Sequence, residues 1–418
     1  MKVGIIGSGG REHAICHFLS KSKKIKKIYC IPGNAGTSSI SENINLDINN
    51  HLKIKNFIKK NKIDLVIVGP ERPLVEGLVD YLENNEIKVF GPNKKSSKLE
   101  GSKIFTKKLC KKYNIPTANF KIFNNLNKSK KFLLNTKYPL VIKADNLASG
   151  KGVYICKNKQ EAINSVKEIF GGKFGKAKNV LVEEFLNGEE MSYFIISDGK
   201  TIKNFGTAQD HKRVGEGDTG KNTGGMGAYS PAPIVDEKIH QKIIDEVMTP
   251  TVHGLISEGS PYLGFLYAGL MIKDGEIKVL EFNCRFGDPE TQPILLRLKS
   301  SLVELCLAAI NDELESHEIE WTEKHSCGVV IASQGYPENY ESNKLVSLPN
   351  STENETKLFH AGTKLSNNEV LTSGGRVFCA TALGDNLKEA QAKAYNLVDQ
   401  VSFEGAFFRK DIGFKGIK

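Results

Sequence analysis

The stretch Lys2-Val3-Gly4-Ile5-Ile6-Gly7-Ser8-Gly9-Gly10-Arg11-Glu12-His13-Ala14 opens the chain and decides the class of its first domain. Lys2–Ile6 is expected to be a short buried strand, the glycines a tight turn, and Arg11–Ser20 a helix. An apolar strand followed by a Gly/Pro turn recurs at Ile28–Ile31, Leu65–Val68 and Lys88–Phe90. Strands that alternate with turns and helices predict an α/β domain with a parallel sheet and ligand groups at the strands' carboxyl ends.

The first glycine turn is suited to binding phosphate, because a helix N-terminus presents free backbone N–H groups. The dinucleotide fingerprint needs a third glycine at position 12, and Glu12 stands there instead. The missing glycine argues against NAD. With Arg11 at the helix start, a small phosphorylated substrate fits better, and a tight β–α turn without a ligand is the alternative.

The chain is too long for one compact core, so we expect about two to four domains. Its longest apolar runs, Leu65–Val68 and Gly328–Ala332, have the length of buried strands and are far too short to span a membrane. Met1–Ile6 leads directly into the glycine turn, without a basic and then apolar leader. We therefore expect a cytoplasmic protein with no membrane association.

The formal net charge of +10 raises the alternative of a nucleic-acid-binding protein. Only seven of the 58 basic residues are Arg, and the Lys occur in short clusters such as Lys21–Lys27 without interleaved aromatic residues. Nucleic-acid-binding proteins usually favour Arg forks and stacked rings, so we interpret these Lys as a solvated surface. The eight cysteines form no C-x-x-C pair, which favours buried reduced thiols over a zinc site or disulfides.

The chain changes character from about Gly101. The expected elements are a helix at Lys103–Lys112, strands at Leu140–Ala144 and Val180–Phe185, a hairpin of Tyr267–Ile272 and Lys278–Phe282, and a helix at Thr291–Leu307. Gly215–Gly227 is expected to be an unpacked loop of the length that usually carries function. After Ser326 a strand-rich tail is expected, with strands at Cys327–Ala332, Lys357–His360 and Arg376–Ala382 and a last helix at Leu387–Val401.

A second phosphate-suited feature is Lys143, at the end of an apolar strand, followed by Ser149-Gly150-Lys151-Gly152. A Lys at a strand end supplies a fixed charge, and flanking glycines let backbone N–H groups approach phosphate oxygens. The spacing is not that of a Walker A motif. An ordinary surface turn is the alternative.

The strand expected at Val180–Phe185 carries two carboxylates, Glu183 and Glu184, where it emerges from the hydrophobic core. Its edge can pair its backbone with an adenine ring while a carboxylate accepts a hydrogen bond from the exocyclic amine. The later Glu190 can hold ribose hydroxyls. A strand with a solvated acidic end is the alternative.

The segment Glu281–Thr291 is the most informative one. Glu281 and Asn283 lie two apart on a strand and therefore face the same side, ready to offer oxygens to a hard cation such as Mg²⁺. Arg285 continues that side and can bring a planar fork to an anion that the metal holds. Three polar groups on one side of an otherwise apolar strand are costly without a ligand, so a metal site is favoured.

Asp210-His211-Lys212-Arg213 precedes the glycine-rich segment Thr223-Gly224-Gly225-Met226-Gly227. Donors and a carboxylate on a mobile segment suit a lid that closes on an amine substrate and phosphate. Asp210 that merely neutralises its basic neighbours is the alternative. His211 can be a general base, but a histidine in a loop is more often a hydrogen-bonding group.

These motifs in this order resemble the family of phosphoribosylamine–glycine ligases (glycinamide ribonucleotide synthetases) along essentially the full chain. The most specific matching runs are Asp210–Arg213 and Glu281–Pro293. The resemblance implies an α/β (α+β overall) fold with three parts. These are a Rossmann-like N-terminal domain at 1–102 that binds phosphoribosylamine, a central ATP-grasp domain at 103–325 in which 117–190 is a mobile ATP-binding subdomain, and a small β-rich C-terminal domain at 326–418.

The implied reaction joins glycine to 5-phosphoribosylamine through a glycyl phosphate, with ATP and Mg²⁺ or Mn²⁺. By resemblance, the ATP-binding residues are Lys103, Lys143, Ser149, Gly150, Lys151, Gly152, Glu183, Glu184, Phe185, Leu186 and Glu190, and the metal ligands are Glu281 and Asn283. The residues assigned to the substrates are Gly10, Arg11, Asn34, Glu71, Asp210, Gly225, Met226 and Arg285, and those assigned to catalysis are Arg285, Asp210 and Lys212. The expected partners are the two small substrates, with a monomeric state and transient contact with neighbouring pathway enzymes.

The sequence departs from the family pattern at Arg72, where a small or amide residue is usual, and at Gln334, where glycine is usual. The strand at Leu266–Ile272 carries no carboxylate, although many ATP-grasp enzymes place a metal ligand on the equivalent strand. The alternatives are an NAD-dependent oxidoreductase, a nucleic-acid-binding protein, and, as the nearest rival, another ATP-grasp ligase that uses a different acid.

Overall fold

The structure is a computed structural model that describes residues 1–147, 152–175, 177–350 and 355–417. Its N-terminal part is a parallel sheet in the order β3-β2-β1-β4-β5. The strands are β1 (Lys2–Gly7), β2 (Lys27–Pro32), β3 (Glu42–Asn43), β4 (Leu65–Val68) and β5 (Val89–Phe90). The helices of this part are α1 (Gly10–Ser20), α2 (His51–Asn61), α3 (Glu71–Glu76) and α4 (Leu78–Glu83), with a 3-10 turn, η1, at Thr37–Ser39. The parallel α/β arrangement predicted from the first glycine turn is confirmed.

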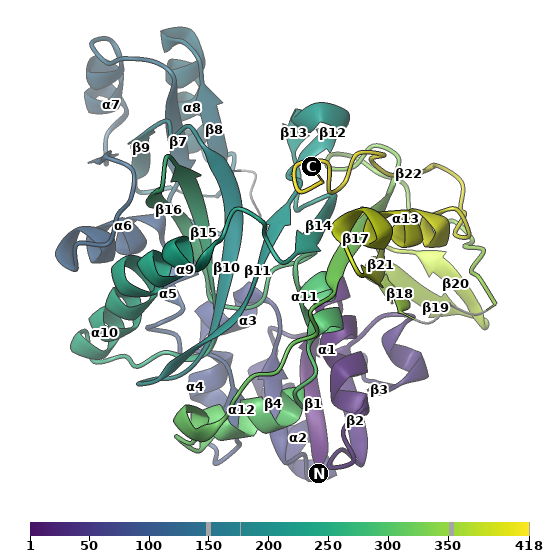
Figure 1. The fold of residues 1–418 in the computed structure, drawn as a ribbon. Coiled ribbons are helices and arrows are strands. Elements are labelled where there is room, and N and C mark those ends of the chain that lie inside the picture. The colour runs from purple at the N-terminus through teal and green to yellow at the C-terminus, as the bar shows by residue number, and fades with distance from the viewer. Residues whose placement is uncertain (148–151, 176, 351–354, 418) are drawn as a thin grey trace.

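A small antiparallel sheet in the order β6-β9-β7-β8 projects from the rest of the chain (Figure 1). Its strands are β6 (Phe120–Phe123), β7 (Leu140–Ala144), β8 (Val153–Cys156) and β9 (Val180–Glu184), and its helices are α7 (Leu126–Leu133) and α8 (Lys159–Phe170). Buried side chains such as Leu133, Ile142 and Val166 give this unit a hydrophobic core of its own. A separate core is what a subdomain that moves as a unit needs, and that motion stays a prediction.

A large sheet runs through the middle of the molecule in the order β16-β15-β10-β11-β14-β17-β21-β18, with β22 paired to β17. Its strands are β10 (Glu189–Asp198), β11 (Ile202–Asp210), β14 (Gly227–Ser230), β15 (Leu263–Lys273), β16 (Glu276–Asn283), β17 (His325–Ser333), β18 (Thr356–His360), β21 (Arg376–Gly384) and β22 (Ala406–Phe407). Because β14 pairs with β17, the sheet continues across the predicted boundary between residues 325 and 326.

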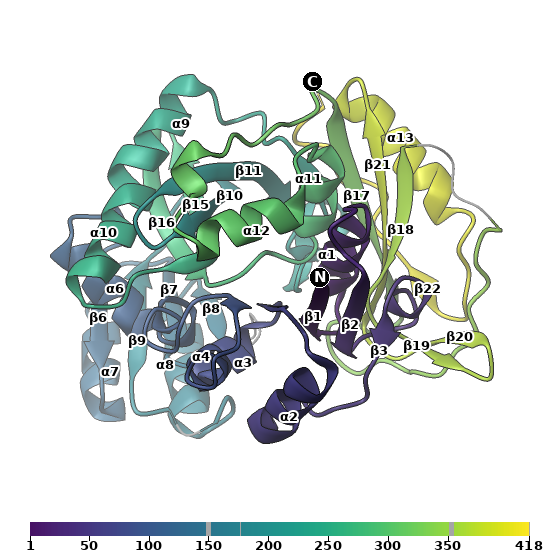
Figure 2. The ribbon, with the colours of Figure 1, turned by 90° about the horizontal axis from the view of Figure 1, so that it is seen from below.

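Helices cover the large sheet, and two short hairpins extend from it (Figures 1 and 2). The helices are α5 (Lys98–Gly101), α6 (Lys103–Lys112), α9 (Glu237–Ile243), α10 (Thr249–Ser257), α11 (Thr291–Arg297), α12 (Leu302–Ile310) and α13 (Leu387–Val398), with single turns η2 (Glu216–Asp218), η3 (Ile244–Met248) and η4 (Leu314–Ser316). The hairpins are β12 (Arg213–Gly215) with β13 (Thr219–Asn222), and β19 (Thr363–Ser366) with β20 (Glu369–Thr372).

Two local predictions were wrong. The helix expected over Thr291–Leu307 is divided into α11 and α12, because Leu298 is extended and the N–H groups of Lys299 and Ser300 donate to the Glu320 carbonyl. Part of the expected loop at Gly215–Gly227 is paired, since β12 and β13 form a hairpin with exposed β13 side chains. In both places a tertiary or cross-strand contact overrides the local pattern, which the sequence alone does not reveal.

All eight cysteines are buried free thiols, as the absence of a C-x-x-C pair predicted. Across the described residues, every helix falls short of the length and apolar character that a membrane crossing requires.

Candidate active site

A cavity of about 590 Å³ lies where the three sheets meet. Its walls come from the first glycine turn, the start of α3, helix α6, strands β7 and β9, and the ends of β11 and β16. The residues predicted for the site that line it are Arg11, Glu71, Lys103, Lys143, Glu183, Glu184, Phe185, Leu186, Glu190, Asp210, Lys212, Glu281, Asn283 and Arg285. The structure therefore gathers most of the predicted nucleotide, metal and substrate residues into one space.

Glu183 lies between two lysines at the base of the small sheet. Its carboxylate oxygens are 3.0 Å from Nζ of Lys143 and 3.3 Å from Nζ of Lys107, and the Lys107 and Glu183 side chains are each only 2% exposed. Lys107 also donates to Oγ1 of Thr117 at 2.6 Å. One carboxylate with two ammonium groups leaves a net positive charge facing the cavity, which suits a phosphate. Lys107 was not predicted from the sequence, where its only signal is that it follows Lys103 by one helical turn.

The side chain of Glu184 has different partners from that of Glu183 and connects the small sheet to its neighbours. Its carboxylate accepts from Nζ of Lys278 at 2.8 Å and from the backbone N–H and side-chain amide of Asn119, both at 3.1 Å. These contacts join β9 to β16 and to the segment that enters the small sheet. The side chain of Glu184 is thus structural, while the backbone from Glu184 to Leu186 follows the cavity wall.

Lys212 and Glu190 form an ion pair across the cavity. Burial alone lowers the pKa of Lys212, but Glu190, Tyr267 and Asp210 raise it well above its ordinary value, so the ammonium stays charged. The predicted ribose carboxylate therefore pairs with the predicted catalytic lysine. Lys103 donates to the carbonyl of Asn146 at 3.2 Å.

Glu281 and Asn283 face the cavity together, as their spacing predicted. Burial raises the pKa of Glu281, but Lys212, Lys143, Lys103 and Arg285 outweigh it and hold the pKa below its ordinary value. One carboxylate and one amide oxygen suit Mg²⁺ or Mn²⁺, which often take one or two protein oxygens and complete their shell with phosphate and water. The described residues include no group of three His, Cys, Asp or Glu side chains placed for a metal.

The strand that pairs with β16 has no carboxylate at this position. Gly269 lies opposite Glu281, and a Cβ there would come within 3.0 Å of Oη of Tyr267. The ring of Tyr267, which lines the cavity, takes the space that a longer side chain at position 269 would need. Of these two strands, only β16 therefore offers a carboxylate to the predicted metal site.

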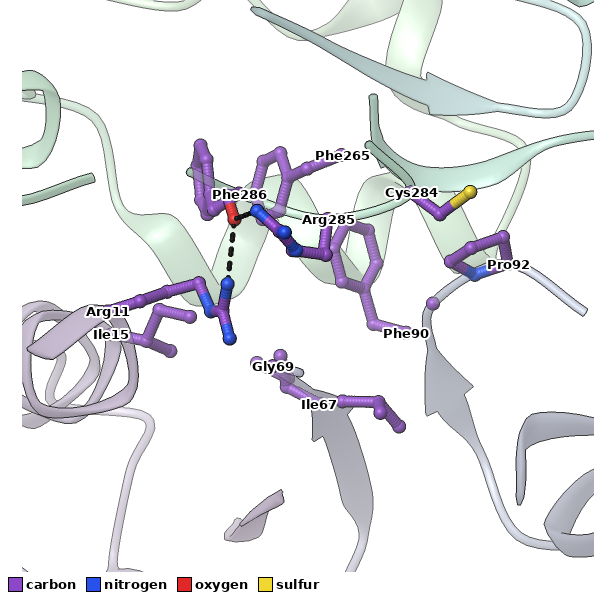
Figure 3. Close-up of a pocket in the computed structure, with 12 residues that line it drawn as sticks. Arg11, Ile15, Ile67, Gly69, Phe90, Pro92, Phe265, Cys284, Arg285 and Phe286 are labelled. Carbon is purple, nitrogen blue, oxygen red and sulfur yellow. Dashed lines mark hydrogen bonds between the residues drawn. The ribbon is translucent and has the colours of Figure 1, made fainter. Parts of the chain in front are cut away.

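Arg285 is held between two carboxylates. Its Nη2 donates to Glu100 at 2.7 Å, and its Nε lies 3.4 Å from Oε2 of Glu71. Burial raises the pKa of Glu100 to about 7, although Arg285 opposes the shift. The Phe286 carbonyl accepts from Arg285 and from Arg11, each at 3.0 Å, so two guanidinium groups converge on one oxygen (Figure 3). Glu100 was not predicted, because its contact with Arg285 exists only in the folded chain.

Asp210 and Glu290 form a carboxylate pair in the same wall. Burial, together with the nearby charges of Glu290 and Glu190, raises the pKa of Asp210 to about 8, although Lys212 opposes the shift. Glu290 accepts from Oγ of Ser192 at 3.1 Å, and burial raises its pKa as well. A cationic amine placed beside them would favour both carboxylate forms. Glu290, like Lys107 and Glu100, was not predicted from the sequence.

Arg376 brings a third guanidinium to the cavity from β21. Its Nη1 donates to the carbonyls of Asp288 at 2.5 Å, Gly224 at 2.6 Å and Gly225 at 3.4 Å. The Asp288 side chain accepts from the backbone N–H of Arg11 at 3.3 Å. Arg376 therefore ties β21 to the glycine turn end of the cavity. From the sequence, Arg376 was predicted only as the first residue of a strand.

Some predicted residues lie beside the cavity. Among the described residues, Gly10, Asn34, Gly152, Gly225 and Met226 are not in its lining. Asn34 is buried, and its amide donates to the carbonyls of Ser8 and His360, both at 2.9 Å. It thus shapes the first glycine turn and joins it to β18. The predicted phosphate contacts of Ser149, Gly150 and Lys151 fall outside the described residues.

The two departures from the family pattern lie away from the cavity. The Arg72 side chain is 65% exposed and pairs with Glu76 at 3.8 Å along α3. Gln334 donates its N–H to the carbonyl of Gly405 at 2.7 Å, in a turn that β22 follows. Neither residue changes the shape of the cavity wall.

Comparison with known proteins gives one consistent family. Residues 1–100, 101–291 and 326–415 match the models of the N domain, the ATP-grasp (A) domain and the C domain of phosphoribosylglycinamide synthetase. Phosphoribosylamine–glycine ligases of Vibrio parahaemolyticus and Yersinia pestis are each 48% identical, covering 100% of this chain and 99% of the relative. The crystal structure of the Thermotoga maritima phosphoribosylamine–glycine ligase is 34% identical, with a TM-score of 0.88, and the match covers 99% of this chain and 100% of that one.

A more distant structure shows how widely the fold is shared. The biotin carboxylase domain of the Hydrogenobacter thermophilus 2-oxoglutarate carboxylase matches with a TM-score of 0.75 at 15% identity, covering 97% of this chain and 91% of that one. This likeness extends to the fold alone, and it confirms the central ATP-grasp architecture. The cavity, the full-length match and the 48% identity lead to one conclusion: the chain belongs to the phosphoribosylamine–glycine ligase family.

Proposed function

We propose that this cavity joins glycine to 5-phosphoribosylamine at the expense of ATP, giving glycinamide ribonucleotide, ADP and phosphate. One observation carries the assignment of the cavity: four cations surround two metal-suited oxygen ligands, namely Lys103, Lys143, Lys212 and Arg285 around Glu281 and Asn283. This arrangement suits a triphosphate with a divalent cation better than an uncharged ligand. Family membership supports glycine and phosphoribosylamine as the substrates.

ATP is placed with its adenine along the backbone of Glu184–Leu186 and its phosphates between Lys103 and Lys143. Glu183 orients Lys143 through their 3.0 Å ion pair. The ribose hydroxyls fall to Glu190, so nucleotide binding requires Lys212 to leave its ion pair with Glu190. The released ammonium of Lys212 can then approach the γ-phosphoryl group.

Glu281 and Asn283 are the residues that would hold the divalent cation, Mg²⁺ or Mn²⁺. When bound, such a cation neutralises negative charge on the phosphate oxygens and so favours attack by an anion. The low pKa of Glu281 supports this role, because the carboxylate is already ionised and needs to lose no proton on binding a cation.

In the first step, a carboxylate oxygen of glycine attacks the γ-phosphorus of ATP, the bond to the β–γ bridging oxygen breaks, and ADP leaves. Arg285 is placed at the glycine carboxylate and the transferring phosphoryl group, with its guanidinium fixed by Glu100 and Glu71. Asp210 is placed at the glycine ammonium, and a cation there keeps the carboxylate ionised despite burial. Charge stabilisation at fixed positions is the main source of rate in such a step.

In the second step, the amine nitrogen of phosphoribosylamine attacks the carbonyl carbon of glycyl phosphate, phosphate leaves, and the nitrogen loses a proton. Phosphoribosylamine is placed at the glycine turn end, with Arg11, Glu71 and Arg376 around it and Gly10, Asn34, Gly225 and Met226 shaping the wall. Arg376 and Arg11 there supply the positive charge that a phosphate monoester needs. Closure of the small unit over the cavity would exclude water from an acyl phosphate that hydrolyses readily.

The deciding experiment measures ADP release from purified enzyme with ATP, with glycine and phosphoribosylamine added separately and together. ADP release is expected to depend on both substrates. Release with a different amino acid and without glycine would overturn the substrate assignment, and release without phosphoribosylamine would show only an uncoupled first step.

We also propose that the enzyme is a cytoplasmic monomer. The cavity residues to which we assign ATP, the cation and both substrates belong to one chain, so the proposed chemistry uses no residue of a second copy. Light scattering on the eluted protein is expected to give a mass near 46.1 kDa. A stable dimer that loses activity on dilution would overturn the proposal.

A further inference from the structure

The C-terminal segment, residues 406–417, packs on the loop that follows strand β11. Figure 1 shows this segment beside the β12–β13 hairpin. Asp210 ends β11, and the chain then passes through His211 and Lys212 into the hairpin. None of residues 406–417 is among the described residues that line the cavity. The segment can therefore affect the active site only indirectly, through the elements that it contacts, and the loop after β11 is one of them.

Arg409 is the principal side chain of the segment, and it is only 1% exposed. Its Nε and Nη2 donate to the two oxygens of Asp411, both at 2.7 Å. Its Nη1 donates to Oδ1 of Asp218 at 2.8 Å and to the carbonyl of Arg213 at 2.9 Å. A guanidinium buried to this extent is stable only when its donors and charge are matched, so Arg409 fixes the hairpin geometry tightly.

His211 connects this network to the active-site strand. Its ring is buried, and Nε2 accepts from the backbone N–H of Gly413 at 2.9 Å. A neutral imidazole has one proton, so that proton is on Nδ1, which lies 3.5 Å from Oδ1 of Asp218. Burial lowers the pKa of His211, which keeps the ring neutral. The ring is thus held on one side by the C-terminal segment and on the other by the hairpin.

The carboxylate of Asp218 pairs with two cationic side chains of the C-terminal segment. Its Oδ1 accepts from Arg409, and its Oδ2 lies 2.6 Å from Nζ of Lys415. The hydrogen bond from His211, with those from Lys415 and Arg409, holds the pKa of Asp218 well below its usual range. Three residues of the C-terminal segment, Arg409, Gly413 and Lys415, therefore converge on one His–Asp pair.

The backbone hydrogen bonds of His211 connect this network to the residues that line the cavity. The N–H of His211 donates to the Gly227 carbonyl at 2.9 Å, and its carbonyl accepts from Met226 at 2.8 Å. In an extended chain, side chains alternate between two sides. Asp210 and Lys212 accordingly line the cavity, while His211 between them points into the buried network.

We propose that the segment Arg409–Lys415 is a positioning element for the reaction, which holds Asp210 and Lys212 in place through His211 and Asp218. This inference rests on the proposed function, in which Asp210 receives the glycine ammonium and Lys212 approaches the γ-phosphoryl group. His211 is then a positioning residue and no general base, because both ring nitrogens are engaged outside the cavity.

The first test compares Arg409→Lys and His211→Asn with the control Lys410→Ala, an exposed neighbour in the same segment. A displacement of the order of 1 Å at catalytic groups is expected to lower kcat by about 10-fold to 100-fold in both network variants. The Kd for ADP is expected to change by less than about threefold, because Lys103 and Lys143 are untouched, and Lys410→Ala should retain wild-type kcat. Arg409→Lys and His211→Asn enzymes that remain folded and keep wild-type kcat would overturn the proposal.

A second measurement does not depend on turnover. Lys212 is paired with Glu190 and is partly enclosed, so its labelling by an amine-reactive reagent should be slow in the ligand-free enzyme. In His211→Asn, which is the milder change, labelling of Lys212 followed by mass spectrometry is expected to accelerate several-fold, while labelling of exposed Lys410 stays constant. An unchanged rate at Lys212 would overturn the positioning role. If wild-type enzyme released no ADP with glycine and phosphoribosylamine, the proposed function would fail on its own, and the labelling result would still decide the role of the segment.

Discussion

Glu100 and Arg285 form a charged hydrogen bond of 2.7 Å, although 185 positions separate them in the chain. The second oxygen of Glu100 accepts from the backbone N–H of Cys284 at 2.8 Å. Glu100 therefore fixes both the guanidinium of Arg285 and the strand end that carries it. An anion that reaches Arg285 meets a group that is already oriented and needs little reorganisation.

Replacing Glu100 by Ala is expected to destabilise the protein strongly. The change leaves Glu71 as the one carboxylate paired with the buried guanidinium of Arg285, beside the Phe286 carbonyl, and loss of one partner of a buried ion pair costs about 3 to 5 kcal/mol. Urea denaturation of the ligand-free protein measures this free energy of unfolding. The matched control is Glu76→Ala, whose exposed partner is Arg72, and its expected cost is below about 1 kcal/mol. Equal destabilisation by the two changes would refute the buried role of Glu100.

Asp210 should make the protein less stable as the pH rises. Its pKa is about 8 in the folded protein against an ordinary value near 3.8, so the folded state binds the proton more tightly. This contribution to stability is complete below about pH 4, declines by roughly 1.4 kcal/mol per pH unit as the pH rises toward 8, and is lost above that. Asp210→Asn has no such proton.

The measurement for Asp210 is the difference in urea midpoint between wild type and Asp210→Asn at pH 6, 7, 8 and 9. Taking the difference removes the contributions of groups common to both proteins, such as the buried histidines. The stability of wild type relative to the variant is expected to fall up to about pH 8 and then level off. The exposed Asp399→Asn variant serves as the control and should follow wild type throughout. A flat difference would show that Asp210 is ionised in the empty cavity.

Glu281→Ala is expected to abolish turnover while the fold stays intact. Removing the only carboxylate of the predicted metal pair should lower kcat by at least about 100-fold, the loss typical of an electrostatic group in a catalytic site. Glu276→Ala, at the exposed start of the same strand, is the control and should keep normal activity. Circular dichroism and the melting temperature monitor folding. Full activity in Glu281→Ala would remove this residue from the metal site.

Arg376→Met is expected to raise the KM for phosphoribosylamine by about 10-fold to 100-fold, because a charge-assisted contact to phosphate is worth about 1.5 to 3 kcal/mol. The Kd for ATP should stay within about twofold of wild type, since the proposed phosphate contacts Lys103 and Lys143 come from α6 and β7 and are unchanged. Lys364→Met removes the same charge from an exposed site on β19 and is the control. If Arg376→Met instead weakened ATP and left the KM for phosphoribosylamine unchanged, the two ends of the cavity would be assigned the wrong way round.

Local patterns in the sequence predicted much of the fold, because strand and turn chemistry is encoded by neighbouring residues. Leu65–Val68, Leu140–Ala144 and Lys103–Lys112 have the bounds that the sequence indicated. The long helix at Thr291–Leu307 was wrong, since the break at Leu298 depends on a contact with Glu320. The two residues of such a contact are far apart in the chain, so no local sequence pattern predicts the contact.

The candidate site divides in the same way. Glu281 and Asn283 could be predicted as a pair because a strand's two-residue period fixes their common side. Four further residues of the site could not be predicted, because each contacts a partner in another element that is distant in the chain. These residues are Lys107, Glu100, Glu290 and Arg376. Asn34 shows the opposite case: its motif marked it for a ligand, and the folded chain directs its amide to backbone carbonyls.

The opening stretch Lys2–Ala14 by itself determined a parallel α/β start with an anion-suited turn, since apolar run, glycine turn and helix signal are all local. Only the tertiary structure decided that Arg11 from this stretch meets Arg285 at the Phe286 carbonyl, and that Arg409 holds the loop behind Lys212. Those relationships depend on packing across hundreds of residues, where buried charges must find partners. The sequence indicated which residues belong to the site, and the packing of distant elements determined how their side chains are oriented.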